Sequence, residues 1–300
     1  YTENPKFVTP NYRLKEITEF VKNGLQDFSI SRLKSKMPWG INVPGDPNHV
    51  MYVWFDALIN YISAIGWPDD MHKYNSWWPV TQFAGKDNLR QQSAIWQAML
   101  MSAGFPTSKQ IFIHGFISID GQKISKSLGN IVDPYDLVNK YGTDALRYYL
   151  LRDIPSYNDG DYSERRFKEL YNSDLANGLG NLVARVAKLA EDLEFDSILK
   201  IDILDSQFSN IISSMENYEF NEALKNIWDE IKYTDKYIND NQPWKLESKA
   251  KKNILVKARF NIWNIATLLI PFLPDTSQKI LAQFAGSKIS IEPSLFPRLT

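Results

Sequence analysis

The stretch VTQFAGKDNLRQQSAIWQAMLMSAGFPTSKQIFIHGFISI, residues 80–119, decides the fold. Its first part, residues 80–85, predicts a strand. The following segment, from about residue 88 to 103, predicts a helix that Gly104 closes. Residues 110–119 predict another strand. Strand, helix and strand in this order form a β-α-β unit, which predicts a parallel, doubly wound sheet.

Two segments precede this unit. Residues 12–23 predict a helix, with Gly24 as its C-cap. The stretch HVMYVWFDA, residues 49–57, is rich in β-branched and aromatic residues and predicts a strand. Residues 1–119 are therefore expected to form an α/β region.

The second half of the chain has a different pattern, because strand signals disappear after about residue 165. Apolar residues at helical spacing predict three helices, over residues 167–193, 221–240 and 250–270. A fourth helix is expected to begin near Asp275, a favourable N-cap residue, and to end at Gly286. The sequence thus predicts an α-helical bundle after the α/β region, with residues 131–165 bridging the two.

The composition excludes several classes of protein. A chain of 300 residues, 44% hydrophobic and 23% charged, is long enough for two domains with cores of their own. The absence of cysteine excludes disulfides and thiolate metal sites and fits a reducing compartment. The three histidines lack metal-ligand spacing. No apolar run approaches the ~20 residues that a membrane span needs.

Two further features concern partners and completeness. With a net charge of −1, the chain has to meet any polyanion through local basic patches. It starts at Tyr1, with neither an initiator methionine nor a signal-like segment, and we expect it to be part of a longer protein.

A cationic loop follows the last predicted strand. In GQKISKSLGN, residues 121–130, Lys123, Ser125, Lys126 and Ser127 lie between two glycines. Ligands of open α/β sheets bind beyond strand ends, and ammonium and hydroxyl groups suit a phosphate. A solvated lysine turn is the alternative interpretation. The loop is not a P-loop, because the pattern GxxxxGK[ST] is absent.

The string KISKS resembles the KMSKS signature of class I aminoacyl-tRNA synthetases, with Ile124 where methionine is common. The context is similar too: IHGF precedes the string and SLGN follows it. YGTDALRYYLL comes next at residues 141–151 and resembles the helix that follows the loop in this family. Four other stretches resemble the methionyl-tRNA synthetases: YVWFDALINYI (52–62), FAGKDNLR (83–90), DLANGLGNLVARV (174–186) and NQPWKL (241–246).

This resemblance runs along the whole chain but covers only the C-terminal portion of such an enzyme. It implies that residues 1–119 are the C-terminal half of the catalytic nucleotide-binding (Rossmann-like) fold. Residues 120–165 would then be the KISKS loop and connecting segment, and residues 166–300 the α-helical anticodon-binding domain. The N-terminal half with its HIGH signature is not in this sequence, and neither is the zinc knuckle of some members, in agreement with the zero cysteines.

The resemblance also implies roles in the ATP site. Lys123 and Lys126 would contact ATP phosphates and stabilise charge during adenylate formation, and Ser125 and Ser127 would bind ATP with them. The physical basis is a cation that meets a developing negative charge. Gly85 at the end of the strand at 80–85, together with Lys86 and Asp87 directly after it, would lie on the adenosine side. The alternative for Asp87 is a cap on the following helix.

Further matches concern the methionine pocket. Trp54, Ala57, Leu58 and Tyr61 match its lining, and polarisable aromatic walls suit a thioether. The alternative for Trp54 is an ordinary core residue. The common pattern has an aromatic residue and a histidine where this chain has Gln91 and Gln92. Gln92 is either a polar floor of the amino-acid pocket or a core residue whose hydrogen bonds are satisfied within the protein.

In the bundle, the resemblance assigns anticodon recognition to three residues, Asn181, Arg185 and Trp244. Asn177, Asn181, Arg185 and Lys188 form a polar stripe at helical spacing. Arginine can reach phosphates or base edges, and tryptophan can stack on an unpaired base. The alternative is a solvated helix face. A basic patch for backbone contacts is expected nearby, formed by Lys249, Lys251, Lys252, Lys257 and Arg259.

The implied activity is the attachment of methionine to its tRNA through methionyl-adenylate, with ATP and Mg²⁺ as the substrate complex. The expected partners are methionine, ATP and tRNA, without zinc and without a membrane, in the cytoplasm. This chain alone is expected to be inactive. Two alternatives stay open: a piece of a leucyl, isoleucyl or valyl enzyme, or a non-catalytic tRNA-binding protein that keeps the loop.

Overall fold

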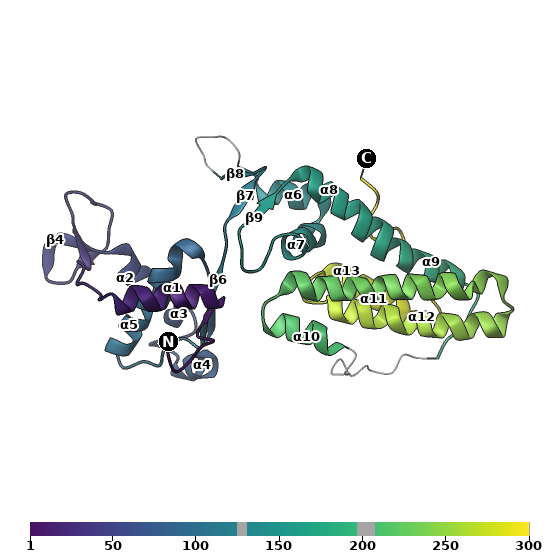
Figure 1. Cartoon of the computed structure of the whole chain (residues 1–300), viewed down its shortest axis with the longest axis horizontal. Helices are drawn as coiled ribbons and strands as arrows, with labels where there is room; N and C mark the ends of the chain where they lie inside the picture. The colour runs from purple at the N-terminus through teal and green to yellow at the C-terminus, as the bar shows by residue number, and fades with distance from the viewer. Residues whose placement is uncertain (125–130, 197–207, 300) are drawn as a thin grey trace. The chain divides into compact units, whose positions relative to one another are not determined.

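The computed structural model describes residues 1–124, 131–196 and 208–299. The chain divides into two compact units, Tyr1–Phe116 and Ile117–Thr300 (Figure 1).

Among the described residues of the first unit, a parallel sheet has the strand order β1-β6-β5. Its strands are β1 (Val8–Thr9), β5 (Thr81–Gly85) and β6 (Gln110–His114). Ile111 and Ile113 of the central strand are buried with Ile17 of helix α1 (Asn11–Lys22). The parallel sheet, the β-α-β unit and the helix before Gly24 are therefore confirmed.

The helix predicted over residues 88–103 is present, but its beginning is irregular. A 3₁₀ turn (Lys86–Asn88) and a π-helical segment (Gln91–Ile95) precede the α-helix α5 (Trp96–Ser102). Gly104 then adopts a φ of +75°, which a glycine tolerates best, and the chain turns away. Short π-helical segments occur frequently at functional sites, and this one carries Gln91 and Gln92.

The strand predicted over residues 49–57 is wrong in its second half. Strand β4 (Asp46–Met51) stops at Met51 and pairs with two antiparallel partners, β2 (Ser31–Leu33) and β3 (Asn42–Val43). Three short helices follow: α2 (Val53–Ala57), α3 (Asn60–Ser63) and α4 (Met71–Trp77). Packing overrides β-propensity here, because helical turns bring Leu58 and Ile62 together with the buried Trp96 in one apolar cluster.

The single strand predicted over residues 110–119 is two strands in two sheets. Strand β6 ends at His114, and β7 (Ile117–Ile119) lies in the second unit. There β7 pairs antiparallel with β8 (Gln122–Lys123) and parallel with β9 (Gly160–Tyr162). The apolar pattern runs through the break without a charge or a proline, and Gly115 was the local signal that could have indicated it.

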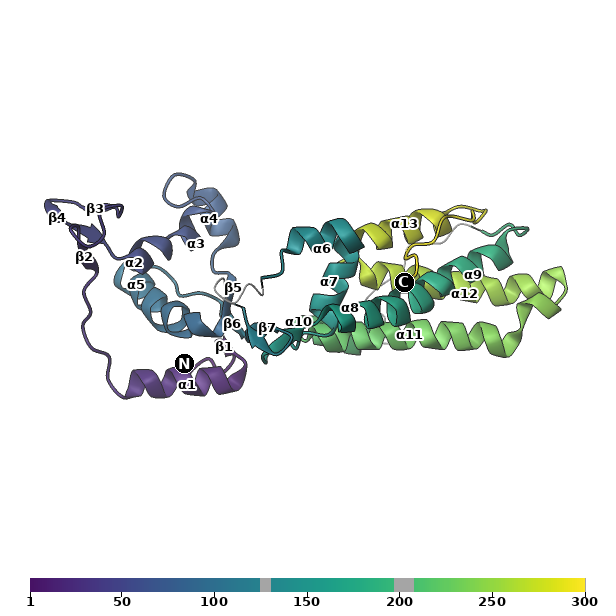
Figure 2. The same ribbon diagram turned by 90° about the horizontal axis from the view of Figure 1, so that it is seen from above.

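The second unit is mainly helical in its described part, as predicted (Figure 2). The predicted helix over 167–193 comprises α8, a π-helical segment and α9, and the other three correspond to α11, α12 and α13. Helix α7 confirms the helix that the resemblance implies after the loop, whereas α6 and α10 were not predicted individually. The bounds are α6 (Pro134–Tyr141), α7 (Thr143–Arg152), α8 (Glu164–Leu170), the π-helical segment (Tyr171–Gly180), α9 (Asn181–Ala190), α10 (Ser209–Glu216), α11 (Phe220–Asn241), α12 (Ser248–Leu269) and α13 (Pro274–Ala285).

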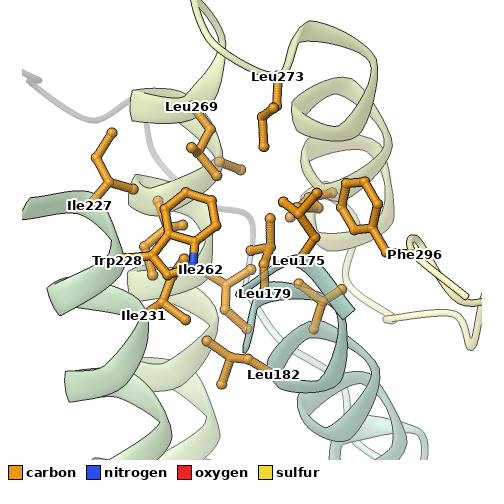
Figure 3. Packing of buried hydrophobic residues seen from close by; sticks show 14 of the residues in the cluster. Leu175, Leu179, Leu182, Ile227, Trp228, Ile231, Ile262, Leu269, Leu273 and Phe296 are labelled. Carbon is orange, nitrogen blue, oxygen red and sulfur yellow. The ribbon is translucent and has the colours of Figure 1, made fainter. Parts of the chain in front are cut away.

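One apolar core holds these helices together (Figure 3). Leu175 and Leu179 of the π-helical segment and Leu182 of α9 point toward two residues of the neighbouring helices. These are Trp228 of α11 and Ile262 of α12. All of these side chains are at most 4% exposed. Truncating such a residue to alanine costs roughly 2–5 kcal/mol of stability. Because the leucine face has to stay buried, the polar face of α9 must lie on the opposite side of the helix.

Asp275 does not act as the predicted N-cap of α13. The N-cap position is Leu273, which supplies no side-chain cap, and Asp275 lies in the first turn. Instead, Asp144 of α7 accepts a hydrogen bond from the backbone N–H of Thr276 at 2.6 Å. A carboxylate distant in sequence therefore satisfies an N–H group at this helix start.

Candidate functional site

Gly85, Lys86 and Asp87 lie where β5 leaves the sheet, at the edge where open parallel sheets bind ligands. A Cβ added at Gly85 would lie 2.9 Å from Oδ1 of Asp87. A side chain at position 85 would therefore displace this carboxylate from the end of the strand. Gly85 is paired in register with His114, the last residue of β6, so the ends of two strands meet here.

The side chains of Lys86 and Asp87 at this edge differ in their contacts. Lys86 holds its ammonium 4.5 Å from the ring centroid of Phe116, a cation–π distance. Asp87 is exposed, and its carboxylate accepts no hydrogen bond from the described residues. The 3₁₀ turn has no side-chain cap, so Asp87 does not cap the helix. This leaves the carboxylate available for a hydroxyl donor on a ligand.

The residues predicted to line an amino-acid pocket come from α2 and α3. Trp54 lies on α2 and Tyr61 on α3, and both are partly buried against the cluster around Trp96. Leu58, 1% exposed, belongs to that cluster, whereas Ala57 is half-buried. The ring centroids of Tyr61 and Trp96 are 6.1 Å apart. The four residues thus follow one another along α2, the turn after it and α3, so Trp54 and Ala57 lie on a helix and not on the predicted strand.

The structure separates Gln91 from Gln92. Gln92 is 3% exposed and donates from Nε2 to the Tyr61 hydroxyl at 2.9 Å. Gln91 lines a different cavity of about 650 Å³, together with Phe20 and Arg90. Its buried Oε1 has no hydrogen-bond partner among the described residues. Gln92, but not Gln91, is therefore joined to the predicted pocket lining.

The base of the KISKS loop is a tight hairpin in the second unit. Strands β7 and β8 are joined by Asp120 and Gly121, with φ values of +48° and +73°. Asp161 of β9 fixes this turn: its Oδ1 accepts hydrogen bonds from the N–H of Gly121, at 2.8 Å, and from the hydroxyl of Ser118. Sequence reasoning overlooked Asp161, because an isolated acidic residue carries no motif.

The chemically important part of the loop lies outside the described residues. This applies to Ser125, Lys126 and Ser127, and for Lys123 only the backbone in β8 is described. Their roles stay predictions from the sequence.

In the bundle, Arg185 is held by α11. Its guanidinium lies 2.9 Å from an Oδ1 of Asp235 and donates to Oδ1 of Asn239 at 2.9 Å. Asn239 lies in the last turn of α11, which leads directly into Pro243 and Trp244. Arg185 is thus placed beside the start of the segment that carries Trp244. Asp235 and Asn239 were not identified from the sequence, although their spacing of four on one helix was visible.

Asn181 and Trp244 both face solvent within the second unit. Asn181 lies one turn before Arg185 on α9, and its side chain makes no hydrogen bond to any described residue. Trp244 is 50% exposed in a 3₁₀ turn that buries Pro243. Two other members of the polar stripe are bonded locally, Asn177 to Arg298 at 2.8 Å and Lys188 to Glu191 at 2.5 Å.

The predicted basic patch loses one member. Arg259 is 3% exposed and donates to the carbonyls of Phe284, Ala285 and Gly286 at the end of α13. Burial lowers the pKa of its guanidinium, against the opposing effect of Asp196. Lys257 does lie on the surface, with its ammonium 4.7 Å from the ring centroid of Tyr237. The sequence did not show that Lys257 is exposed and Arg259 is buried, because both are basic residues on the same helix. In the structure Arg259 belongs to the buried face of α12.

Two features are absent from the described residues, a metal site and a membrane-spanning helix. No three His, Cys, Asp or Glu side chains there come together as a metal site. Within the same residues, no helix has the length and apolar character to cross a membrane.

Two known protein-family models match this chain. The model described as tRNA synthetases class I (M) matches residues 1–187, more than half of the chain. This chain belongs to the class I (M) tRNA synthetases. The model for the anticodon-binding domain of tRNA ligases matches residues 201–300. The first family model therefore covers the α/β unit and extends into α9 (Asn181–Ala190), and the second covers residues from 201 to the end of the helical unit.

Individual relatives agree with this assignment. The methionine–tRNA ligase of Thermotoga maritima is 42% identical over 299 residues, which is 93% of this chain and 47% of the relative. That of Synechocystis is also 42% identical, over 94% of this chain and 57% of the relative. The class I synthetase chain therefore spans about half the length of these relatives.

Solved structures give the same picture for the fold. Mycobacterium tuberculosis methionyl-tRNA synthetase in complex with methionyl-adenylate matches with a TM-score of 0.88 and 34% identity. The match covers 99% of this chain and 65% of that structure. The apo form of the same enzyme matches with a TM-score of 0.84.

Proposed function

We propose that the protein containing this chain attaches methionine to its tRNA through methionyl-adenylate, with ATP and Mg²⁺ as the substrate complex. The observation that carries the proposal is the match to a methionyl-tRNA synthetase bound to methionyl-adenylate, over 99% of the chain. In the reaction, a carboxylate oxygen of methionine attacks the α-phosphorus of ATP and pyrophosphate leaves. The amino acid then passes to the tRNA and AMP is released.

The proposed ATP site uses the sheet edge and the loop. Gly85 keeps the end of β5 open, and the Asp87 carboxylate accepts hydrogen bonds from ribose hydroxyls. Lys86 lies beside Asp87 on the adenosine side. Lys123 and Lys126 bind the leaving phosphates, with Ser125 and Ser127 as further donors. Such cations stabilise negative charge that develops in the transition state.

The remaining residues select the two substrates. Trp54, Ala57, Leu58 and Tyr61 contact the methionine side chain, with Gln91 and Gln92 on the neighbouring helix. Asn181, Arg185 and Trp244 read the anticodon. In this proposal residues 1–119 are the second half of the catalytic fold, 120–165 the loop and connecting segment, and 166–300 the anticodon-binding domain.

We further propose that residues 1–300 alone do not form the adenylate. The chain spans about half of its relatives, and β5 has no strand partner on its outer side among the described residues. An additional part of the protein would complete both the sheet and the nucleotide site.

Amino-acid-dependent ATP–pyrophosphate exchange tests this proposal. The protein encoded by the complete gene is assayed with methionine, leucine, isoleucine and valine in turn, and residues 1–300 are assayed in parallel. Exchange with methionine only, by the longer protein only, is the expected result. Exchange with leucine, isoleucine or valine would assign one of those specificities. Binding of tRNA without any exchange would indicate a non-catalytic tRNA-binding protein.

A further inference from the structure

The antiparallel sheet of β2, β4 and β3 carries a loop with an exposed tryptophan. This loop, residues 34–41, joins β2 to β3 and is called the 34–41 loop below. Trp39 on it is 78% exposed, compared with 63% for Trp77 and 50% for Trp244. A single exposed apolar side chain is common on protein surfaces, so the way this indole is held and the charges around it decide its significance.

The backbone around Trp39 is fixed by a tight turn. The N–H of Gly40 donates to the carbonyl oxygen of Met37 at 3.3 Å. Pro38 occupies the second position of this turn, where its restricted φ is favourable. A Cβ added at Gly40 would lie 2.7 Å from Cβ of the buried Val50, so glycine lets the turn pack directly on the sheet. Trp39 is therefore presented to solvent on a rigid backbone, which lowers the entropic cost of binding a ligand.

The surroundings of this turn carry a positive charge. Between the start of β2 and the end of β4, the only acidic residue is Asp46, and the basic residues are Arg32, Lys34 and Lys36. The carboxylate of Asp46 is already engaged, because its Oδ2 lies 2.7 Å from Nδ1 of His49. Neither Lys34 nor Lys36 forms an ion pair or a side-chain hydrogen bond with a described residue. In a chain with a net charge of −1, these two ammonium groups form a local basic patch.

The sheet is attached to the segment that carries the predicted amino-acid pocket. Strand β4 ends at Met51, and α2 with Trp54 begins at Val53. Figures 1 and 2 both show β4 next to α2 within the first unit. Arg32 of β2 places its guanidinium 4.1 Å from the ring centroid of Tyr52, a cation–π contact with the residue just before α2. A ligand on the 34–41 loop is therefore bound to the same unit as methionine in the proposed function.

We propose that the 34–41 loop binds the unpaired 3′ end of the tRNA, with a base stacked on Trp39 and backbone phosphates beside Lys34 and Lys36. Aromatic side chains next to cations are the usual binding surface for single-stranded nucleic acid. The proposal rests on the proposed function, in which tRNA is a substrate. Of the single-stranded regions of a tRNA, the anticodon is assigned to the second unit, whereas the 3′ end has to reach the amino acid bound in the first unit.

Binding of intact tRNA and of tRNA that lacks its unpaired 3′ nucleotides tests the proposal. In the protein encoded by the complete gene, we expect Trp39→Ala to raise the Kd for intact tRNA at least about fivefold, the lower end of what one stacked base contributes. The Kd for the truncated tRNA should not change, because the base that would stack is absent. Trp39→Phe keeps an aromatic ring and should have a smaller effect. Trp77→Ala, which removes another exposed indole of the first unit, is the control.

The salt dependence of binding tests the lysines, and it keeps the test informative if Trp39→Ala impairs folding. Loss of one phosphate contact to a single strand lowers the slope of log Kd against log salt by about 0.7. Lys36→Ala should therefore reduce this slope for intact tRNA and leave it unchanged for truncated tRNA. Lys15→Ala, which removes an exposed lysine on α1, is the control and should affect both tRNAs equally or not at all.

The outcomes separate the two proposals. Absence of methionine-dependent exchange by the unmodified protein would refute the proposed function, whereas the comparison of the two tRNAs requires no catalysis and decides the role of the loop by itself. Equal weakening with intact and truncated tRNA would overturn the 3′-end contact, as would unchanged binding in both Trp39→Ala and Lys36→Ala. A fall in Tm and in exchange for Trp39→Ala, with the ratio of the two Kd values unchanged, would also overturn it, because the indole would then pack against another part of the protein.

Discussion

The guanidinium of Arg185 on α9 lies 2.9 Å from the carboxylate of Asp235 on α11. Asn239, one turn further along α11, accepts from the same guanidinium and donates to Asp235 at 3.0 Å. Two side chains of α11 thus hold the guanidinium of Arg185. A guanidinium held in this way keeps a defined orientation toward solvent and loses less side-chain entropy when a ligand binds.

Replacing Arg185 tests its proposed role in anticodon recognition. Lysine keeps the charge but cannot span Asp235 and Asn239, so we expect Arg185→Lys to slow tRNA charging roughly tenfold and Arg185→Ala to slow it more. Because the ion pair is partly exposed, the free energy of unfolding should change by less than about 1 kcal/mol. Methionine-dependent exchange is the internal control, and an equal loss of exchange would argue against an anticodon role.

Trp244 should affect tRNA and leave stability almost unchanged. Its side chain is 50% exposed, and stacking of a base on an aromatic ring contributes roughly 1–3 kcal/mol. Trp244→Ala should therefore weaken charging with little change in Tm. Trp228 is the matched control: it is 4% exposed, and its ring centroid lies 4.4 Å from that of Tyr148. Trp228→Ala should cost roughly 3–5 kcal/mol of stability.

The opposite pattern would assign Trp244 to packing. In that case Trp244→Ala would melt early and would charge tRNA normally at low temperature.

Lys126 is predicted from the sequence to stabilise the leaving pyrophosphate. In the protein encoded by the complete gene, Lys126→Ala should lower the adenylation rate at least about a hundredfold, as the loss of one transition-state contact commonly does. Methionine binding without ATP should barely change. Lys109→Ala, which removes an exposed lysine on the loop before β6, is the control. A wild-type exchange rate for Lys126→Ala would exclude the phosphate role.

The sequence predicted the order of most strands and helices correctly, because each of these elements has an apolar pattern with a fixed period. The strand at 80–85, the helix after it and the bundle helices all follow from such patterns and from glycine stops. The strand predicted over residues 49–57 was wrong in its second half, because Trp54 has high β-propensity but lies on a helix. Propensity is a weak guide where burial against a distant residue such as Trp96 decides.

Contacts between distant residues were invisible to sequence reasoning. Gln92 was expected either in the pocket or as a satisfied core residue, and the structure shows it bonded to Tyr61. Its partners Gln82 and Ser108 carry no motif, and only the fold brings them together. For the same reason Arg259 was assigned to a surface patch although it is buried.

The contact between α6 and α8 should depend on pH. Lys140 and Tyr141 donate hydrogen bonds to Glu164 at 2.8 and 2.6 Å and lower its pKa to about 2. Because the folded pKa is below the unfolded one, the contact stabilises the protein at pH values above the ordinary glutamate pKa. That stabilisation is lost as the pH falls through the folded pKa.

The urea midpoints of the unmodified protein and Glu164→Gln should therefore differ most near neutral pH and converge in acid. The difference will be modest, because the ion pair is solvent-exposed. Glu247→Gln, which replaces an exposed glutamate without such partners, should show no such pH dependence. A gap that widens in acid would contradict the assigned direction of the pKa.

Arg259 should be essential for the stability of the bundle and irrelevant to direct tRNA contact. Its guanidinium donates to the carbonyl oxygens of Phe284 at 3.0 and 2.8 Å, Ala285 at 3.1 Å and Gly286 at 2.7 Å. Another donation, to the carbonyl of Asp196, is 2.7 Å long. The carbonyls at the end of α13 have no partner in the helix itself and carry its negative dipole end. A cation held there satisfies both requirements.

Arg259→Ala would leave these carbonyl groups without their donors, and we expect it to lower the free energy of unfolding by roughly 3–5 kcal/mol. Arg259→Lys should be nearly as harmful, because one ammonium group cannot reach all of these oxygens. Lys257→Ala, two residues earlier on the surface of α12, should cost less than about 1 kcal/mol. Chemical unfolding of the three variants, followed by tRNA binding at a temperature where each is folded, distinguishes the roles. Normal stability with weakened tRNA binding in Arg259→Ala would return this residue to the basic patch.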